Sequence, residues 1–386
     1  SVDQNIPFLG GTLSLQSSLS RLDQFNYDLQ TYNTVPLILN YTQPIRAYNA
    51  LKWRKKTAPL QYENAQRAYL ETMQDITINV TNLFFTVLSA QENYRQSVAD
   101  YEDRKHLFEI AKKRLDLGTT TKSEVLQMEL SLLNAKMSVN STSLTLRTQL
   151  FSLFSYLRIV DYGDIELLPP YYMPEIEMNA EQVLDKAWTG SSHSIEQQLN
   201  LLESQRALAE AKANRGLQVE FRGRLGLSQS ANELPAAYRR LKDYETVGLT
   251  MTIPIYDWGM GRGKVRMAKT DVEITKTQIE QANIEFAHDV RTKVMQFNNQ
   301  AEQCKTSLRA QDIAAERYDI MKKRFENGSV TVTELNTAQE EFESAQHQYI
   351  SQLQQFWTDY YGIQKLTLYD FIRKENIGVN FNDLVN

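Results

Sequence analysis

The chain contains the sequence KKRLDLGTTTKSEVL at residues 112–126 and the sequence KKRFENGSVTVTELN at residues 322–336. The second stretch repeats the first at an offset of 210 positions. Three chemically distinctive positions recur at this offset: Gly118 and Gly328, Thr121 and Thr331, Glu124 and Glu334. Two copies at so large an offset indicate a duplicated half-protein rather than a solenoid of short repeats.

Each stretch has the chemistry of a tight turn between two helices. The basic residues before Gly118 suit the negative end of a helix dipole, and the glycine suits the left-handed conformation that ends a helix. Thr121 is placed to cap the next helix, with Glu124 three residues later closing a capping box. The second copy repeats the pattern, so the sequence predicts two antiparallel helical hairpins.

The segments flanking these turns have the spacing of long packed helices. Apolar residues from Met73 to Tyr94 and from Val265 to Phe286 step alternately by three and four positions, which is coiled-coil spacing. We expect helices at about 58–116, 121–158, 262–326 and 331–366. The first member of each pair would be roughly 90–95 Å long, too long for a small globular domain.

Period-two alternation precedes the second long helix. In VGLTMTIPI (247–255) apolar residues alternate with glycine, threonine and proline, and QVEFRGRLGLS (218–228) alternates in the same way. This pattern predicts strands of about 9–11 residues with one apolar and one polar face. The residues expected to face lipid are Val247, Leu249, Met251 and Ile253. Weaker counterparts near residues 13–19 and 35–41 bring the expected number of strands to four, with polar loops at 22–34 and 229–246.

Aromatic residues and cations gather at the strand ends, as they do at a membrane interface. The candidate interface aromatics are Tyr48, Trp53, Tyr256 and Trp258. Four strands cannot close a transmembrane barrel, which needs at least about eight, and an open edge in lipid would leave backbone groups unpaired. We therefore expect other copies of the chain to complete the barrel.

Composition excludes several classes of protein. The 386 residues carry a net charge of −5. This negative charge gives no indication of the basic surface that binds nucleic acid. The four histidines show no metal-ligand spacing, and the single cysteine, Cys304, indicates no nucleophile. WGMGRGK (258–264) departs from the phosphate-loop pattern because Trp258 replaces its first glycine. We expect no catalysis, no metal and no cofactor.

The order strand, strand, helix, turn, helix, given twice, resembles the TolC-like outer-membrane efflux protein family. The resemblance rests on residues 246–269, 323–339 and 113–130 and extends over about residues 9–368. It implies a mainly α chain with a small β part, in a homotrimer with a shared 12-stranded barrel and a periplasmic helical tube. It further implies an outer-membrane location, contact with outer-membrane lipid, and two partners: a periplasmic adaptor (membrane fusion) protein and an inner-membrane pump or ABC transporter.

The resemblance also suggests how the chain is divided. The expected segments are a first strand pair (9–45), a first hairpin (46–160), an equatorial segment (161–178), a helix (179–215), a second strand pair (216–257), a second hairpin (258–366) and a C-terminal equatorial segment (367–386). The 210-residue offset would put the partner of helix 179–215 before residue 1, so we expect an N-terminally truncated or trimmed form. Pro59 should either begin its helix or kink it.

Two readings stay open for the glutamates. Glu124 and Glu334 match positions of aperture acids in the family, yet a capping box alone accounts for them; Thr337 stands where the family has a second acid. The resemblance also makes Gly118, Thr121, Gly328 and Thr331 candidates for docking on an adaptor. The expected function is a passive exit duct for efflux or type I secretion. The alternative is a soluble coiled-coil scaffold or adaptor, which would not account for the strand pairs.

Overall fold

The computed structural model describes residues 1–386 apart from 7, 26–28, 161, 162, 164, 171, 172, 327, 328 and 382–386. It divides into two compact units. The first comprises Ser1–Gln66 and Ser192–Glu285, and the second comprises Arg67–Ser191 and Phe286–Asn386. Two long helices, α1 (Ala50–Asp116) and α6 (Met260–Glu326), contribute residues to both units.

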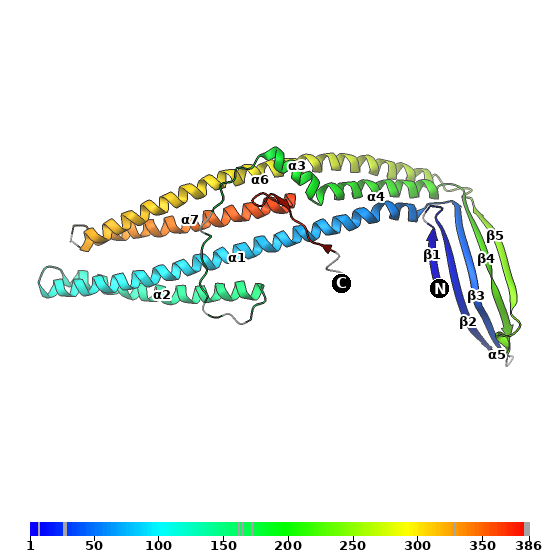
Figure 1. Cartoon of the computed structure of the whole chain (residues 1–386), viewed down its shortest axis with the longest axis horizontal. Coiled ribbons are helices and arrows are strands. Elements are labelled where there is room, and N and C mark those ends of the chain that lie inside the picture. Colours follow the sequence, from blue (N-terminus) through cyan, green and yellow to red (C-terminus); the bar gives the residue numbers. More distant parts are fainter. Residues whose placement is uncertain are drawn as a thin grey trace. The chain divides into compact units, whose positions relative to one another are not determined.

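The first unit contains an antiparallel sheet in the order β1-β2-β3-β4-β5 (Figure 1). Its strands are β1 (Val2–Ile6), β2 (Gly11–Gln24), β3 (Leu29–Arg46), β4 (Gln218–Ala231) and β5 (Lys242–Thr252). The four expected strands are present, but three of them are longer than expected, at 14, 18 and 14 residues. The loops expected at 22–34 and 229–246 are shorter than predicted. Residues 22–24 and 29–34 continue β2 and β3, and residues 229–231 and 242–246 continue β4 and β5, whereas 232–241 lie between the strands and include the short helix α5 (Leu234–Ala237). Polar and tyrosine residues are paired across the ladder there, as Tyr32 is with Arg21.

Strand β1 was not predicted, because VDQNI lacks an apolar alternation. It pairs with the first residues of β2, from Ile6 opposite Gly11 to Val2 opposite Leu15. Since neighbouring strands all run antiparallel, β2 and β4 point one way and β1, β3 and β5 point the other. The outermost strands β1 and β5 are therefore parallel, whereas β2 and β5 are antiparallel.

The register gives the sheet two chemically different faces. Residues directly opposite each other lie on the same face. The apolar face joins Leu249 to Phe221, and Tyr41 to Leu13. The other face is polar: it carries Thr12 and Ser14 on β2, Asn40 and Thr42 on β3, Glu220, Arg222 and Arg224 on β4, and Thr246 and Thr250 on β5. Such a two-faced sheet suits a wall between lipid and water.

The helix expected at 179–215 is broken into α3 (Ala180–Gly190) and α4 (His193–Asn214), which corrects that prediction. Ser191 has extended backbone angles and ends α3. A Cβ atom on Gly190 would lie 2.0 Å from the carbonyl oxygen of Thr367, so only glycine permits this close approach of α3 to the end of α7 (Val332–Thr367). This contact is between residues far apart in sequence, and the local sequence does not show it.

The duplication is visible in the helices. Helices α1 and α6 both have 67 residues, and their bounds coincide under the 210-residue offset. Helix α2 (Lys122–Tyr156) likewise corresponds to α7. The start of α1 was predicted too late. Pro59 lies inside the helix, nine residues after its first residue, so it does not begin α1.

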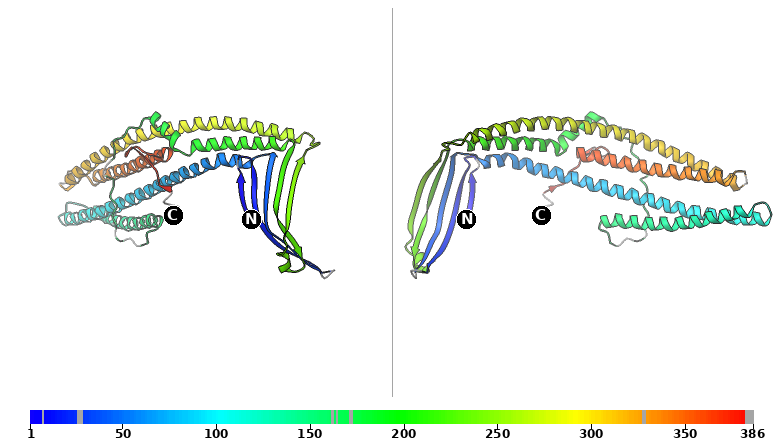
Figure 2. Two further views of the ribbon diagram at one scale, coloured as in Figure 1. Left: turned by 45° about the vertical axis from the view of Figure 1, so that its right-hand side comes forward. Right: turned by 180° about the vertical axis from the view of Figure 1, so that it is seen from behind.

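In the second unit, α7 packs beside α6 and α1, which two further views also show (Figure 2). One apolar core joins Phe297 of α6 to Phe356 and Tyr360 of α7 and to Val183 of α3. A second core joins α1, α6 and α7 around Leu88 and Leu353. The chain then forms the short strands β6 (Tyr369–Asp370) and β7 (Glu375–Asn376).

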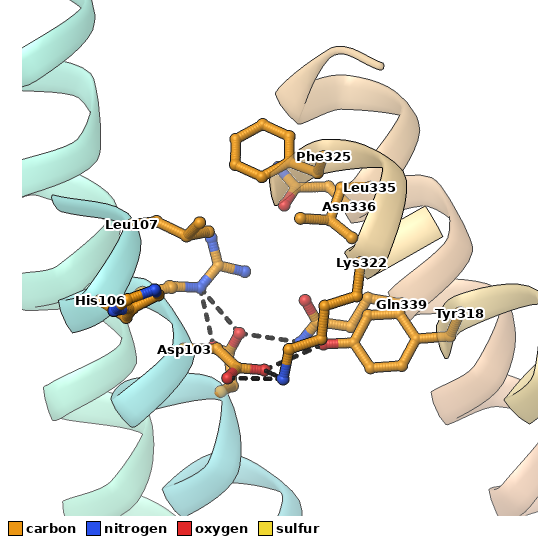
Figure 3. A pocket seen from close by; sticks show the side chains of 11 residues that line it. Asp103, His106, Leu107, Tyr318, Lys322, Phe325, Leu335, Asn336 and Gln339 are labelled. Carbon is orange, nitrogen blue, oxygen red and sulfur yellow. Dashed lines mark hydrogen bonds and ion pairs between the residues drawn. The ribbon is translucent and has the colours of Figure 1, made fainter. Parts of the chain in front are cut away.

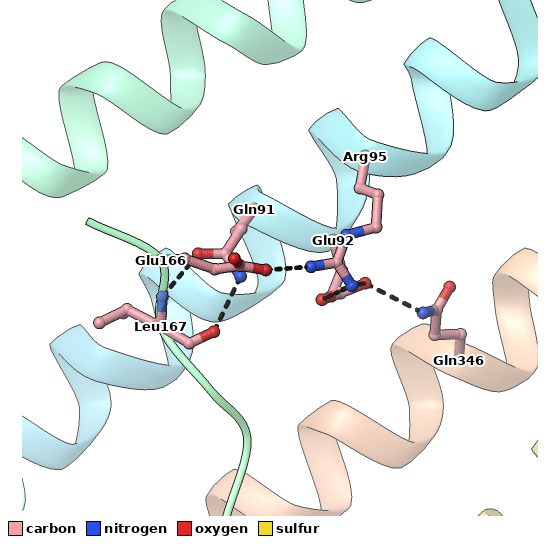
Figure 4. A network of polar contacts seen from close by, with 6 residues as sticks. All are labelled: Gln91, Glu92, Arg95, Glu166, Leu167 and Gln346. Carbon is pink, nitrogen blue, oxygen red and sulfur yellow. Dashed lines mark hydrogen bonds and ion pairs between the residues drawn. The ribbon is translucent and has the colours of Figure 1, made fainter. Parts of the chain in front are cut away.

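Two side-chain amides hold the segment between α2 and α3. Gln91 of α1 bonds both the backbone N–H and the carbonyl of Leu167, each at 2.8 Å (Figure 4). Asn298 of α6 does the same at Met178, at 3.0 and 2.9 Å. An ion pair from Arg95 to Glu166 at 2.5 Å adds a third attachment. The role of this segment as an equatorial belt stays a prediction.

Among the described helices, none has a stretch both long and apolar enough to cross a membrane.

Candidate functional site

The turn between α1 and α2 has the geometry of a glycine-terminated helix. The N–H of Thr119 bonds the carbonyl of Arg114 at 2.8 Å, and the N–H of Gly118 bonds that of Leu115 at 2.9 Å. These two bonds define the Schellman motif. Gly118 has φ +69°, and nothing lies within 4 Å of the place where a Cβ would be. The requirement for glycine is therefore conformational and not a matter of space.

Both capping boxes are present. Thr121 accepts a bond from the Glu124 N–H at 3.3 Å, and its own N–H donates to the Glu124 carboxylate at 3.0 Å. Thr331 and Glu334 repeat this arrangement at 3.3 and 2.7 Å. Gly328 lies outside the described residues. The N–H of Ser329 donates to the Arg324 carbonyl at 2.9 Å, and the 210-residue offset relates this bond to the one from Thr119 to Arg114.

The hydrogen bonds also set the charge at these turns. The Thr120 hydroxyl and the Thr121 backbone N–H hold the pKa of Glu124 below its usual value. The backbone N–H and then the hydroxyl of Thr331 do the same to the pKa of Glu334. Because both carboxyls are solvent-exposed, each is a fixed negative charge beside a turn at neutral pH. Capping and a role in attracting cations are thus compatible.

A polar cluster joins the two hairpins further along the helices (Figure 3). Lys322 of α6 bonds both carboxylate oxygens of Asp103 on α1, at 2.8 and 2.9 Å. The Tyr318 hydroxyl donates to the same carboxylate at 3.3 Å, and Gln339 of α7 bonds Asp100 of α1 at 2.8 Å. Burial, reinforced by Asp103, raises the pKa of Tyr318, so its hydroxyl remains a donor.

Sequence reasoning missed this cluster. Lys322 follows Asp103 by 219 residues, and no local pattern links them. The cluster nevertheless connects α1 to both helices of the other hairpin, α6 and α7. Asp103 lies 13 residues before the end of α1, which is roughly 20 Å along the helix.

The apolar residues predicted to face lipid are exposed in the single chain. Val247, Leu249, Met251 and Ile253 are between 56% and 77% exposed. The first three alternate along β5, opposite Gly223, Phe221 and Val219. Ile253 lies outside the strand, which ends at Thr252, and this corrects its assignment. Apolar side chains so exposed need a covering that a single chain does not supply.

The candidate interface aromatics fall into two groups. Tyr256 and Trp258 are 72% and 86% exposed, and their rings pack edge to face with centroids 4.7 Å apart. Trp53 is half-buried, with the Lys56 ammonium 5.1 Å from its ring centre. Tyr48 differs, because its hydroxyl is buried and burial raises its pKa. It is the candidate least suited to contact lipid headgroups.

Trp258 is held in an unusual conformation. Its φ is +53°, a value that bulky residues rarely adopt. The Asp257 carboxylate next to it accepts bonds from the N–H groups of Gly259 and Gly261 at 3.0 and 2.7 Å, which caps the start of α6. An aspartate followed by glycines at the second and fourth positions could have indicated this cap in the sequence. An exposed tryptophan held in a strained turn is a reason to look for a functional contact.

Within the described ranges, no cluster of three or more histidine, cysteine, aspartate or glutamate residues could hold a metal ion. Cys304 is buried, and burial raises the pKa of its thiol to about 11.

Comparison with known proteins agrees with this geometry. The sequence model of the outer membrane efflux protein family matches residues 3–157 and 191–367. No curated protein sequence matches the chain.

Solved structures of outer-membrane channels share the fold. The Campylobacter jejuni CmeC outer membrane channel is 14% identical with a TM-score of 0.71, over 98% of this chain and 81% of that one. The Neisseria gonorrhoeae MtrE outer membrane channel in its open state is 13% identical with a TM-score of 0.70, over 93% and 80%. The outer membrane protein VceC of Vibrio cholerae is 14% identical with a TM-score of 0.65, over 93% and 86%.

The fold class predicted from the sequence is confirmed by these likenesses, and the two matched segments fit the internal repeat. The match covers most of the chain and concerns a family of channels rather than enzymes. The chain belongs to the outer membrane efflux protein family and is an efflux channel protein of the outer membrane.

Proposed function

We propose that this chain forms a homotrimeric passive exit duct of a tripartite efflux pump or a type I secretion system. In this duct, three copies share one barrel of twelve strands, β2–β5 from each, and their helical hairpins form a periplasmic tube. Inner-membrane partners supply the energy. The observation that carries the proposal is the sheet itself, which has one apolar and one polar face and two unclosed edges.

Strand direction supports closure between copies. A transmembrane barrel is antiparallel throughout. Strand β5 of one copy can continue the antiparallel order only beside β2 of the next, because β1 runs parallel to β5. Four strands per copy therefore close and five do not. Strand β1, which covers Gly11–Leu15 of β2, would have to leave that edge.

The surface of the first unit supports a membrane setting. Val247, Leu249 and Met251 would contact acyl chains, and the exposed Tyr256 and Trp258 would lie at the headgroup level. The alternative of a soluble scaffold does not account for an exposed apolar sheet face followed by exposed aromatics.

The hairpin turns are proposed as the end that meets a periplasmic adaptor. Gly118 and Thr121 shape the turn between α1 and α2, and Thr331 caps the start of α7. Gly328 stays a docking candidate from its sequence position. Glu124 and Glu334 would give six carboxylates in a trimer near the narrow end of the tube. Carboxylates so arranged attract cations. The Asp103–Lys322 link would restrain the two hairpins in the closed state.

Purification in mild detergent tests the proposal. Sedimentation should give three times the chain mass of 44.6 kDa, and the trimer should conduct ions in a planar bilayer once its tip is opened. A folded monomer that needs no detergent would contradict the duct and favour the scaffold. Adding a candidate adaptor, with its pump or its secretion ATPase, would then distinguish efflux from secretion.

A further inference from the structure

The polar face of the sheet carries an excess of positive charge. Arg222 and Arg224 lie on this face of β4, and Lys242 of β5 joins them, since it is opposite Ser228. Glu220 is the acidic residue on this face of β4. The described residues of β2 and β3 add hydroxyl and amide groups to this face but no carboxylate.

The acids of β5 lie on the opposite face. Asp243 is paired with Leu227 and Glu245 with Leu225, which are residues of the apolar face. They therefore point away from the arginines. In the described residues, strands β2–β5 thus place three cations and one acid on this face, and Asp3 of β1, opposite Ser14, adds a second acid while β1 remains at that edge.

Among the described residues, one of these three cations is neutralised by a carboxylate. Arg222 forms an ion pair with Glu220. In the described part of the chain, neither Arg224 nor Lys242 forms an ion pair with a carboxylate. Arg224 instead interacts with Tyr244, two residues from Lys242. Its guanidinium is exposed and keeps most of its donors available.

The arginines border a hollow on this face. It measures about 380 Å³, and its lining includes Asn40 and Thr42 of β3 and Glu220, Arg222 and Arg224 of β4. Arginine beside hydroxyl and amide donors is the usual way to bind a carboxylate, sulfonate or phosphate group, because its planar fork donates two parallel bonds. The hollow is open, which suits transient binding of a passing solute rather than tight retention.

We infer that Arg224, supported by Arg222 and Lys242, forms an anion-binding site in the barrel lumen that favours transported solutes carrying a carboxylate, sulfonate or phosphate group. The inference rests on the proposed function, because it places the polar face in a lumen shared by three copies. The barrel would then prefer anions while the acids at the hairpin turns prefer cations.

Binding and conduction test this in parallel. The probe for binding is pyrene trisulfonate, whose fluorescence anisotropy reports association with the detergent-purified trimer. The probe for conduction is potassium chloride under a concentration gradient in a planar bilayer. The variant is Arg222→Gln with Arg224→Gln, and the charge-preserving control is Arg222→Lys with Arg224→Lys. Arg309→Gln, an exposed arginine of α6, controls for general loss of positive charge.

The glutamine variant should bind the probe at least about tenfold more weakly, and its chloride-to-potassium permeability ratio should fall by about threefold or more. The lysine variant should keep most of both properties, and Arg309→Gln should change neither. Unchanged binding and permeability in the glutamine variant would overturn the inference, as would equal losses in Arg309→Gln. If the double variant does not assemble, Arg224→Gln alone should show the weaker binding.

The two proposals fail in different ways. A protein that binds the probe through Arg224 but never conducts would retain the anion site and refute the duct. A protein that conducts, and whose probe binding and ion preference are the same in all variants, would retain the duct and refute the anion site.

Discussion

Placing an arginine on the apolar face of β5 should prevent assembly, and Leu249 is the position for this substitution. Leu249 has Val247 and Met251 on either side along its face and Phe221 directly opposite. It therefore lies inside the apolar surface, whereas Val247 borders Glu245. An arginine near the middle of a bilayer costs about 2–4 kcal/mol. Because three copies share one barrel, Leu249→Arg should cost about 6–12 kcal/mol per trimer.

Thr250→Arg is the matched control, because the change is at the next residue. Thr250 is on the polar face, directly opposite Glu220, so the new guanidinium would meet water and a carboxylate. Sedimentation of both variants in mild detergent, and their refolding into lipid vesicles under urea titration, measures the effect. Leu249→Arg should yield little or no trimer, and Thr250→Arg should match the parent chain. Equal losses in both variants, or no loss in either, would refute the assignment of the two faces.

Three further predictions concern the hairpins. Gly118→Val should leave the trimer intact but abolish transport with its adaptor, because valine strains a backbone at φ +69°; normal transport would exclude this turn as the docking site. Lys322→Met should raise the open probability of the purified channel, since a partly exposed ion pair to Asp103 contributes about 0.2–1 kcal/mol per chain; an unchanged open probability would show that this link does not restrain the tip. Glu124→Gln with Glu334→Gln should weaken cation preference in single-channel recordings while leaving the caps largely intact, and unchanged selectivity would make these glutamates helix caps alone. Hydrogen bonds lower the pKa of both carboxyls in the folded chain, so their capping stabilisation is complete above the ordinary glutamate pKa. This stabilisation is lost as the pH falls through the lowered pKa values. Because both carboxyls stay ionised above those values, the ion selectivity of the parent channel should be constant from about pH 5 to 8.

Local motifs explain what could be predicted from the sequence. A capping box needs only residues three positions apart, so Thr121 with Glu124 and Thr331 with Glu334 could be located from spacing alone. The 210-residue offset then placed the second hairpin once the first was known. Alternation along β5 similarly separated Leu249 from Thr250 without any knowledge of the fold.

Contacts between distant residues explain what was missed. At the break, Gly190 packs against the carbonyl of Thr367, which is 177 residues away in sequence. Tyr48 has the sequence context of an interface aromatic, yet burial shields its hydroxyl. The strand ends were placed too early because Tyr32 and its polar neighbours resemble a loop, although they pair with Arg21 and its neighbours.

The central claim is that β2 of one copy pairs with β5 of the next, and disulfide cross-linking tests it most directly. Within one chain β3 and β4 separate these strands, so their backbones are roughly 14 Å apart, too far for a disulfide. Any bond between them must therefore join two copies. A suitable set combines Ser20→Cys on β2 with single cysteines at successive positions from Lys242 to Gly248 on β5, all with Cys304→Ser.

Oxidation of the detergent-purified protein should give, for at least one pairing, a denaturing-gel ladder that ends at a covalent trimer and collapses with reductant. Monomers alone for every pairing, or a ladder that stops at dimers or continues beyond trimers, would contradict a barrel closed by three copies.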